Sequence, residues 1–294
     1  MLWLLIAILA YFLFSLSSLG DKYLLIGPPN PKIYAFYVGV LGILVLLLIP
    51  FVGFYVIDNY LVALLAGLTF LLSILALYEG LERFEVSRII PALGGFLPIF
   101  TFLLTYLIIG QQEFFGWQKL ISFILLILGS VLISLKKSLN LSIKSLLIAG
   151  IAAFLLSLYF VLSKIVFSSA PFWPSFIWIR IGVFFSALFL LFSKEVRREL
   201  FTKKKAFNQK TRKIFLLNQI IGAGAVILQN WSIALASTFY LSFISALQGV
   251  QYAFLFLLTF LFPRLLKEKK NREDVVKKII AIILIGLGLG ILAI

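Results

Sequence analysis

Ten predominantly apolar stretches run along the chain, separated by short polar or proline-containing connections. Each is about 20 residues long, which is the length an α-helix needs to cross a bilayer and about twice that of a barrel strand. The predicted spans are 2–20, 33–52, 60–82, 86–109, 117–135, 144–166, 173–193, 213–235, 238–262 and 275–294.

The composition assigns the chain to the membrane. With 63% hydrophobic and only 13% charged residues, it has too few polar side chains to cover a water-facing surface. Spans in lipid must satisfy their own backbone hydrogen bonds, so helices are expected. The predicted fold class is therefore an all-α polytopic membrane protein. The first stretch lacks a basic region before it and a small-residue cleavage site, so we expect a retained helix rather than a signal peptide.

Two parts of the chain repeat earlier ones with polar and small residues in register. The stretch A-Y-F-L-F-S-L-S-S-L-G-D-K at 10–22 returns as A-A-F-L-L-S-L-Y-F-V-L-S-K at 152–164. Ala92, Leu93, Gly95 and F-L-L-T at 102–105 return as Ala246, Leu247, Gly249 and F-L-L-T at 256–259. Internal repeats in a hydrophobic chain are typical of membrane transporters.

The repeat divides the chain into two halves, 1–140 and 141–294, with five predicted spans each. An odd number of spans means that the second half enters the membrane from the opposite face. We therefore expect two inverted five-helix repeats, ten transmembrane helices in all.

Basic residues predict the orientation. Loops on one side of the membrane hold 23 of the 26 Lys and Arg residues, whereas the other side holds only Lys119 and Lys164. We expect the protein in the cell membrane. By the positive-inside rule the basic loops face the cytoplasm and both termini lie outside. The most basic loop, 194–213, is long enough for a short surface helix. Beside membrane spans we expect it to contact anionic lipid headgroups rather than nucleic acid.

This arrangement resembles the drug/metabolite transporter superfamily, in particular the EamA-like family. The resemblance rests on Pro98, Glu113, Gly129, the Gly286–Gly290 cluster and the paired A-L-x-G segments. Tyr252 stands where a second-half counterpart of Pro98 would be, and Glu268 lies near the place of the second-half acidic residue. The resemblance implies a secondary transporter, with export of amino acids or related metabolites. Family members usually keep both termini in the cytoplasm, whereas here the charge distribution predicts the reverse.

Arg180 is the basic residue inside a span, about two turns from its start. A charged side chain there costs about 2.5–3.5 kcal/mol on insertion scales unless it faces a cavity or a partner. A guanidinium can bind a carboxylate or phosphate through two hydrogen bonds. We weigh a substrate-binding Arg180 equally against a snorkelling or structurally paired one.

Amides form the second group of candidates. Gln229 and Asn230 lie in the eighth span, and Gln248, Gln251 and Tyr252 share one face of the ninth. We expect Gln229, Gln248 and Arg180 to meet in a substrate cavity, with interhelical hydrogen bonding as the alternative. Gly94 and the helix-kinking Pro98 should face the same pocket. The tenth span should be peripheral, with Gly286 and Gly290 against a neighbouring helix.

Aromatic side chains near polar residues complete the predicted substrate site: Tyr11, Tyr78 and Trp178. Glu79 is a potential proton carrier for coupled transport, but Glu82, Arg83, Glu85 and Arg88 follow it. We therefore favour a solvated interfacial cluster there.

The predicted function is secondary transport of a small organic metabolite, such as a carboxylate-bearing solute, by alternating access with possible proton or ion coupling. A lipid or lipid-linked-sugar flippase is the alternative, which would use a lateral groove. The chain has no His or Cys and no clustered intramembrane carboxylates, so we predict neither enzymatic activity nor a metal site. No Walker motif is present, and we expect no cofactor.

Overall fold

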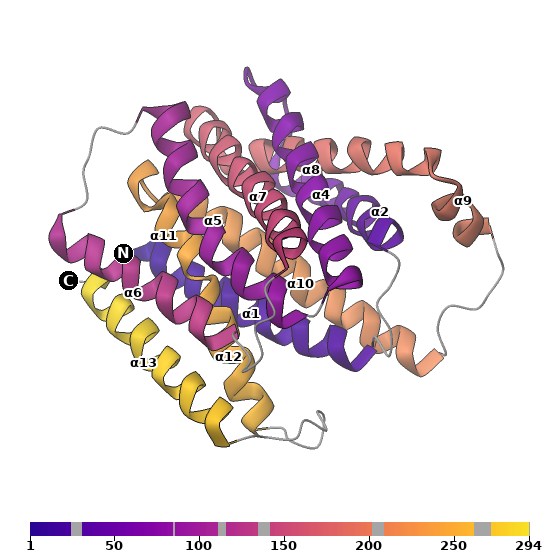
Figure 1. The fold of residues 1–294 in the computed structure, drawn as a ribbon. Coiled ribbons are helices and arrows are strands. Elements are labelled where there is room, and N and C mark those ends of the chain that lie inside the picture. Colours follow the sequence, from indigo (N-terminus) through magenta and orange to yellow (C-terminus); the bar gives the residue numbers. More distant parts are fainter. Residues whose placement is uncertain are drawn as a thin grey trace.

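The computed structural model describes residues 1–24, 31–84, 86–110, 116–134, 142–201, 209–261 and 272–293. All regular elements in these ranges are helices, and they form one bundle (Figure 1). The predicted boundary between the halves, at residue 140, lies outside the described residues, as do Glu113 and Glu268.

The elements are α1 (Leu2–Leu24), α2 (Pro31–Gly42), η1 (Ile43–Leu48), α3 (Ile49–Val52), α4 (Tyr60–Arg83), α5 (Val86–Ile109), α6 (Trp117–Ser134), α7 (Ile143–Ser169), α8 (Phe172–Phe189), η2 (Leu190–Phe192), α9 (Lys194–Phe201), α10 (Gln209–Leu235), η3 (Thr238–Tyr240), α11 (Leu241–Ala246), α12 (Gln248–Leu261) and α13 (Arg272–Ala293).

Nine helical segments of the described chain are long and apolar enough to cross a membrane. They match nine of the predicted spans, so the chain is a multi-pass integral membrane protein. The remaining predicted span, 213–235, forms the continuous helix α10, but it is not among the nine. Its amides make it less apolar than the others: Asn218, Gln219, Gln229 and Asn230.

The main helix pairs join the first part of the chain to the second. α1 packs along α10, α7 packs between α4 and α5, and α6 packs along α13. Both chain ends lie at the same side of the bundle (Figure 1). The two predicted halves therefore interleave instead of folding as separate bodies.

Glycine residues allow a close helix crossing between α4 and α8. A Cβ atom at Gly67 would overlap the α8 backbone around Val183, and one at Gly182 would overlap the α4 backbone at Leu64. The two backbones touch here, which only glycine allows.

The contact between α6 and α13 corrects one prediction. Gly288, not Gly286 or Gly290, faces α6, where it lies against Leu126 and its carbonyl accepts a hydrogen bond from Ser122 Oγ at 2.7 Å. Cβ atoms at Gly286 and Gly290 would meet open space. The helix pair forms as expected, but the four-residue spacing selected the wrong face of α13.

Candidate functional site

Arg180 lies in the middle of α8 and is only 5% exposed. Its guanidinium carbon is 5.1 Å from the ring centre of Phe70 on α4 and 4.9 Å from that of Phe176, one turn earlier on α8. Its aliphatic part lies beside Gly42 of α2. Among the described residues Nη2 has no hydrogen-bond partner and no carboxylate pairs with the guanidinium. The charge is thus supported by two aromatic faces while a donor remains unused.

Tyr159 of α7 connects this arginine to α10. Its ring packs 4.9 Å from that of Phe70, which also contacts Arg180. Its hydroxyl donates a 2.7 Å hydrogen bond to Oδ1 of Asn230. The Asn230 amide nitrogen donates in turn to the Val226 carbonyl at 2.9 Å, so this fully buried amide has partners on both atoms.

Gln229 faces a different side of α10 from Asn230. Its Nε2 donates to the Tyr11 hydroxyl of α1 at 3.4 Å, and that hydroxyl donates to the Ile244 carbonyl at 2.7 Å. Gln229 therefore interacts with Tyr11 of α1, whereas Asn230 interacts with Tyr159 of α7. Adjacent residues point about 100° apart on a helix, so the two amides bond to different neighbours. A meeting of Gln229 with Arg180 in a substrate cavity stays a prediction.

The Ile244 carbonyl is available because the ninth span is interrupted. α11 ends at Ala246 and α12 begins at Gln248. Around this interruption the Leu247 amide bonds to Phe243 and the Val250 amide bonds to Leu247. Tyr11 supplies the Ile244 carbonyl with a hydrogen bond from another helix, which stabilises the break.

Gln248 lies at the first position of α12, directly after the break. Its Oε1 is buried and accepts no hydrogen bond from the described residues. On the same helix Gln251 donates to Ser18 Oγ of α1 at 3.2 Å, and Tyr252 packs against the hydrophobic core. Arg180, Tyr159, Asn230, Gln229, Tyr11 and Gln248 are called the polar belt below. They come from five different helices and are buried or half-buried.

Other predicted site residues lie elsewhere. Trp178 donates from Nε1 to the Tyr55 carbonyl at 3.0 Å and packs on Phe54 and Tyr60, at the segment that joins α3 to α4. It therefore points away from Arg180, although only Ile179 lies between the two residues in the sequence. Tyr78 lies near the C-terminal end of α4, beside Glu79.

A pocket shared by Gly94, Pro98 and Gln248 stays a prediction. Helix α5 continues through Pro98, and Gly94 lies against the Ser130 hydroxyl of α6. Gly249, just after the break in the ninth span, also lies against Ser130. The fourth and ninth spans therefore approach each other across α6, and small residues fill that contact.

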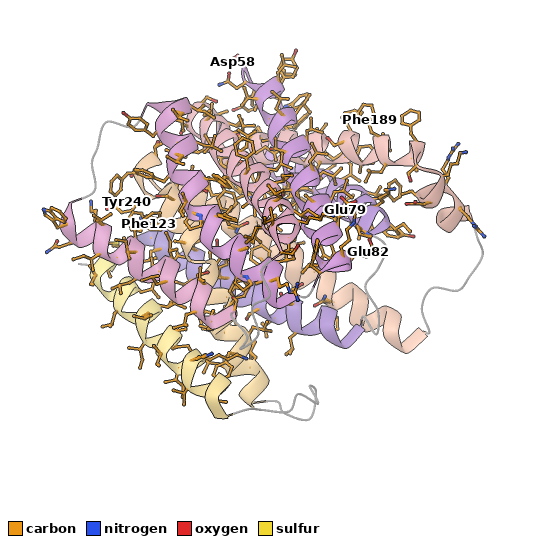
Figure 2. The ribbon with its side chains drawn as sticks, viewed as in Figure 1. Asp58, Glu79, Glu82, Phe123, Phe189 and Tyr240 are labelled. Carbon is orange, nitrogen blue, oxygen red and sulfur yellow. The ribbon has the colours of Figure 1, made fainter. Side chains whose placement is uncertain are left out.

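Glu79 belongs to a solvated cluster, as predicted. It pairs with Arg83 at 2.6 Å, and both side chains are exposed. Asp58 lies at the opposite end of α4 from Glu79 and Glu82 (Figure 2). Glu79 is thus placed at a helix end instead of in the polar belt.

Lys164 has a role that the sequence did not indicate. Although it is only 7% exposed, its Nζ donates to the Ala234 carbonyl at 3.2 Å and to the Ala236 carbonyl at 2.5 Å. These carbonyls lie at the C-terminal end of α10, where a cation is favoured by the helix dipole. Lys164, which the charge count assigned to the outer side of the membrane, therefore caps the C-terminal end of α10.

The comparisons with known proteins concern the fold. No family model and no curated protein matches the sequence. A crystal structure of a protein matches with a TM-score of 0.69 and 14% sequence identity, over 98% of this chain and 94% of that one. The architecture of nearly the whole chain is therefore shared with a solved structure, and at this identity the match establishes the fold alone.

Proposed function

We propose that the chain is a secondary transporter of the EamA-like kind, which moves a small organic solute with an anionic group by alternating access. The observation that carries this proposal is Arg180, a buried guanidinium with an unused donor inside a membrane span. A carboxylate or phosphate on the solute would supply the missing acceptor.

The surroundings of Arg180 support a binding role over a purely structural one. An unpaired arginine inside a span costs stability, so it is expected to face a cavity, a partner or a ligand. Phe70 and Phe176 contact the guanidinium, and Nη2 stays without a partner among the described residues and could bind a ligand. The unpartnered Gln248 oxygen offers an acceptor on another helix of the polar belt.

The helix contacts support two inverted five-helix repeats and ten spans, in which α10 is a span in addition to the nine long apolar segments. If the spans correspond in order, exchanging the halves maps α1 onto α7 and α4 onto α10. The pair α1–α10 then becomes α7–α4, and both pairs occur. The pairs α2–α8 and α6–α13 each map onto themselves and also occur. The position of both ends at one side favours an even number of crossings.

The test uses purified protein in detergent, screened by thermal shift against small organic anions, with flux into liposomes measured for each ligand found. Arg180→Gln should reduce affinity by about ten-fold or more, since a buried charge pair is lost. Arg180→Lys should lose less because it keeps the charge. Arg83→Gln is the matched control, because Arg83 is exposed at a helix end.

Normal transport by Arg180→Gln would contradict the proposal. If Arg180→Gln does not fold, Arg180→Lys decides, because lysine keeps the charge but loses the paired N–H donors of the guanidinium. An affinity of Arg180→Lys equal to that of the wild type for every anion that binds would also contradict the proposal.

A further inference from the structure

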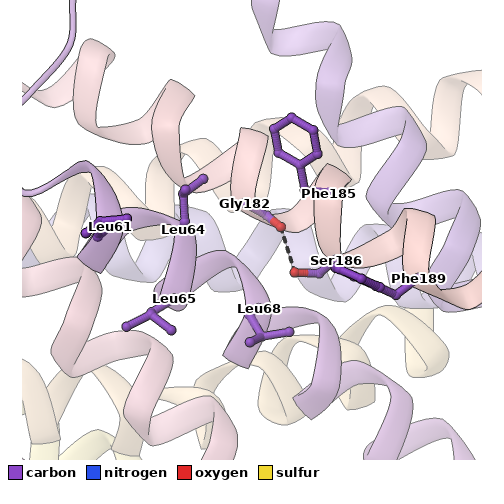
Figure 3. Close-up of a pocket in the computed structure, with 8 residues that line it drawn as sticks. All are labelled: Leu61, Leu64, Leu65, Leu68, Gly182, Phe185, Ser186 and Phe189. Carbon is purple, nitrogen blue, oxygen red and sulfur yellow. Dashed lines mark hydrogen bonds between the residues drawn. The ribbon is translucent and has the colours of Figure 1, made fainter.

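An open groove of about 450 Å³ runs between α4 and α8 on the outside of the bundle (Figure 3). Leucine side chains of α4 line one wall, and Phe185 and Phe189 of α8 line the other. Ser186 contributes the hydroxyl in the groove, and this hydroxyl donates to the Gly182 carbonyl at 2.7 Å. The groove therefore offers an apolar surface.

The glycine crossing explains why the groove exists. Because Gly67 and Gly182 bring the two backbones into contact, the larger side chains beside them diverge and leave a furrow. Leu65, Phe185 and Phe189 are 51%, 53% and 68% exposed. Both helices are membrane spans, so these side chains face the acyl chains of the bilayer.

A basic surface helix follows the end of this groove. Phe189 is succeeded by η2 and then by α9, which turns away from the axis of α8 (Figure 1). The α9 side chain of Val196 is fully buried, and Glu195 pairs with Lys32 of α2 at 2.8 Å. These two contacts fix α9 against the bundle and leave Lys194 and Arg197 exposed.

The distances match one leaflet of a bilayer. From Phe185 the chain stays helical through the end of η2 at Phe192, just before α9. At 1.5 Å per α-helical residue and about 2 Å per 3-10 residue, this corresponds to about 12 Å along the helix axis. Half of the hydrocarbon core is about 15 Å thick. An acyl chain in the groove would thus place its phosphate at the level of α9.

We propose that this groove and α9 form a binding site for an anionic phospholipid. One acyl chain lies between α4 and α8, and the headgroup phosphate contacts Lys194 and Arg197. Exposed basic residues beside a membrane attract anionic headgroups, and the apolar groove adds contact area for the chain. The site is separate from the polar belt and does not depend on which solute the protein transports.

The test uses the absence of native cysteine. Phe185→Cys is labelled with a fluorophore, and the protein is reconstituted in phosphatidylcholine vesicles with increasing amounts of brominated phosphatidylglycerol. Bromine quenches the label when the brominated chain occupies the groove. Leu107→Cys, on a lipid-facing part of α5 that is 74% exposed, is the reference position.

We expect quenching at position 185 to saturate at a several-fold lower fraction of brominated phosphatidylglycerol than of brominated phosphatidylcholine, with no such difference at position 107. In the Phe185→Cys background, Lys194→Gln with Arg197→Gln should abolish the preference, because each of the two charges contributes at most about five-fold. Lys144→Gln with Lys277→Gln removes two charges from the N-terminal parts of α7 and α13, which are predicted to lie on the same side, and should leave the preference unchanged.

Equal preference at positions 185 and 107 would overturn the proposal. So would a preference at 185 that survives the loss of both α9 charges, or one that the Lys144/Lys277 control removes equally. Lys194→Arg with Arg197→Lys keeps both charges and should keep the preference.

Discussion

Individual side chains use hydrogen bonds in this protein to connect helices that are distant in sequence. Tyr159 reaches Asn230, Tyr11 reaches Ile244, and Lys164 reaches the end of α10. In lipid, packing and polar contacts replace the hydrophobic effect as the force between helices. These bonds therefore have consequences for stability that can be measured separately from transport.

Replacing Lys164 with Met should lower the free energy of unfolding by about 2 kcal/mol, because two carbonyls at the end of α10 lose a charged donor. Unfolding in detergent, followed by circular dichroism, measures this. Lys144→Met, at an exposed position on the same helix, is the control and should be neutral. Equal stability of the two variants would show that the cap has no energetic role.

Tyr159 and Asn230 should be energetically coupled. Tyr159→Phe and Asn230→Leu each remove the same hydrogen bond, so the double variant should lose less stability than the sum. The coupling expected inside a membrane is about 0.6–1.7 kcal/mol. Ser122 bonds to α13 instead, so the stability losses of Tyr159→Phe and Ser122→Ala should be additive in the double variant.

At the scale of helices, glycine decides which pairs approach closely. Gly67 and Gly182 allow the α4–α8 contact, and Gly129 and Gly288 allow the α6–α13 contact. A span can also be interrupted where a neighbour supplies the hydrogen bond, as Tyr11 does at the break before α12.

Gly182→Ala should destabilise the protein by about 2–3 kcal/mol, because the new Cβ overlaps the α4 backbone at Leu64 and cannot be avoided by a rotamer change. Gly286→Ala meets open space on α13 and should be neutral, or stabilising by up to about 1 kcal/mol through helix propensity. Thermal unfolding of the two variants in the same detergent gives the comparison. The reverse order would contradict the helix packing described above.

The whole molecule has an asymmetric charge distribution that predicts its orientation. With 23 of 26 basic residues in the loops of one side, those loops should face the cytoplasm. The resemblance to the EamA-like family implies the opposite orientation, with both termini in the cytoplasm.

Single cysteines distinguish the two orientations because the chain has none of its own. One is placed in the 203–210 loop and another after the C-terminus. In intact cells an impermeant thiol reagent should label only the C-terminal cysteine. Labelling of the loop with protection of the C-terminus would show that the orientation of the resembled family holds.

The sequence by itself determined the membrane class, the helical architecture and nearly all helix positions, because apolar runs of span length leave few alternatives in lipid. It also identified Arg180 and the amides of α10 and α12, since charges and amides stand out against an apolar background. Glu79 was correctly assigned to a solvated cluster from the charges that follow it.

The tertiary structure alone decided which of these side chains meet. Whether Gln229 or Asn230 reaches Tyr159 depends on the rotation of α10, and whether Gly286 or Gly288 faces α6 depends on the rotation of α13. When most faces of a helix are apolar, the pattern of residues does not fix that rotation. Packing against neighbouring helices sets it, and so the partners of Arg180, the cap formed by Lys164 and the groove beside Gly182 became visible only in three dimensions.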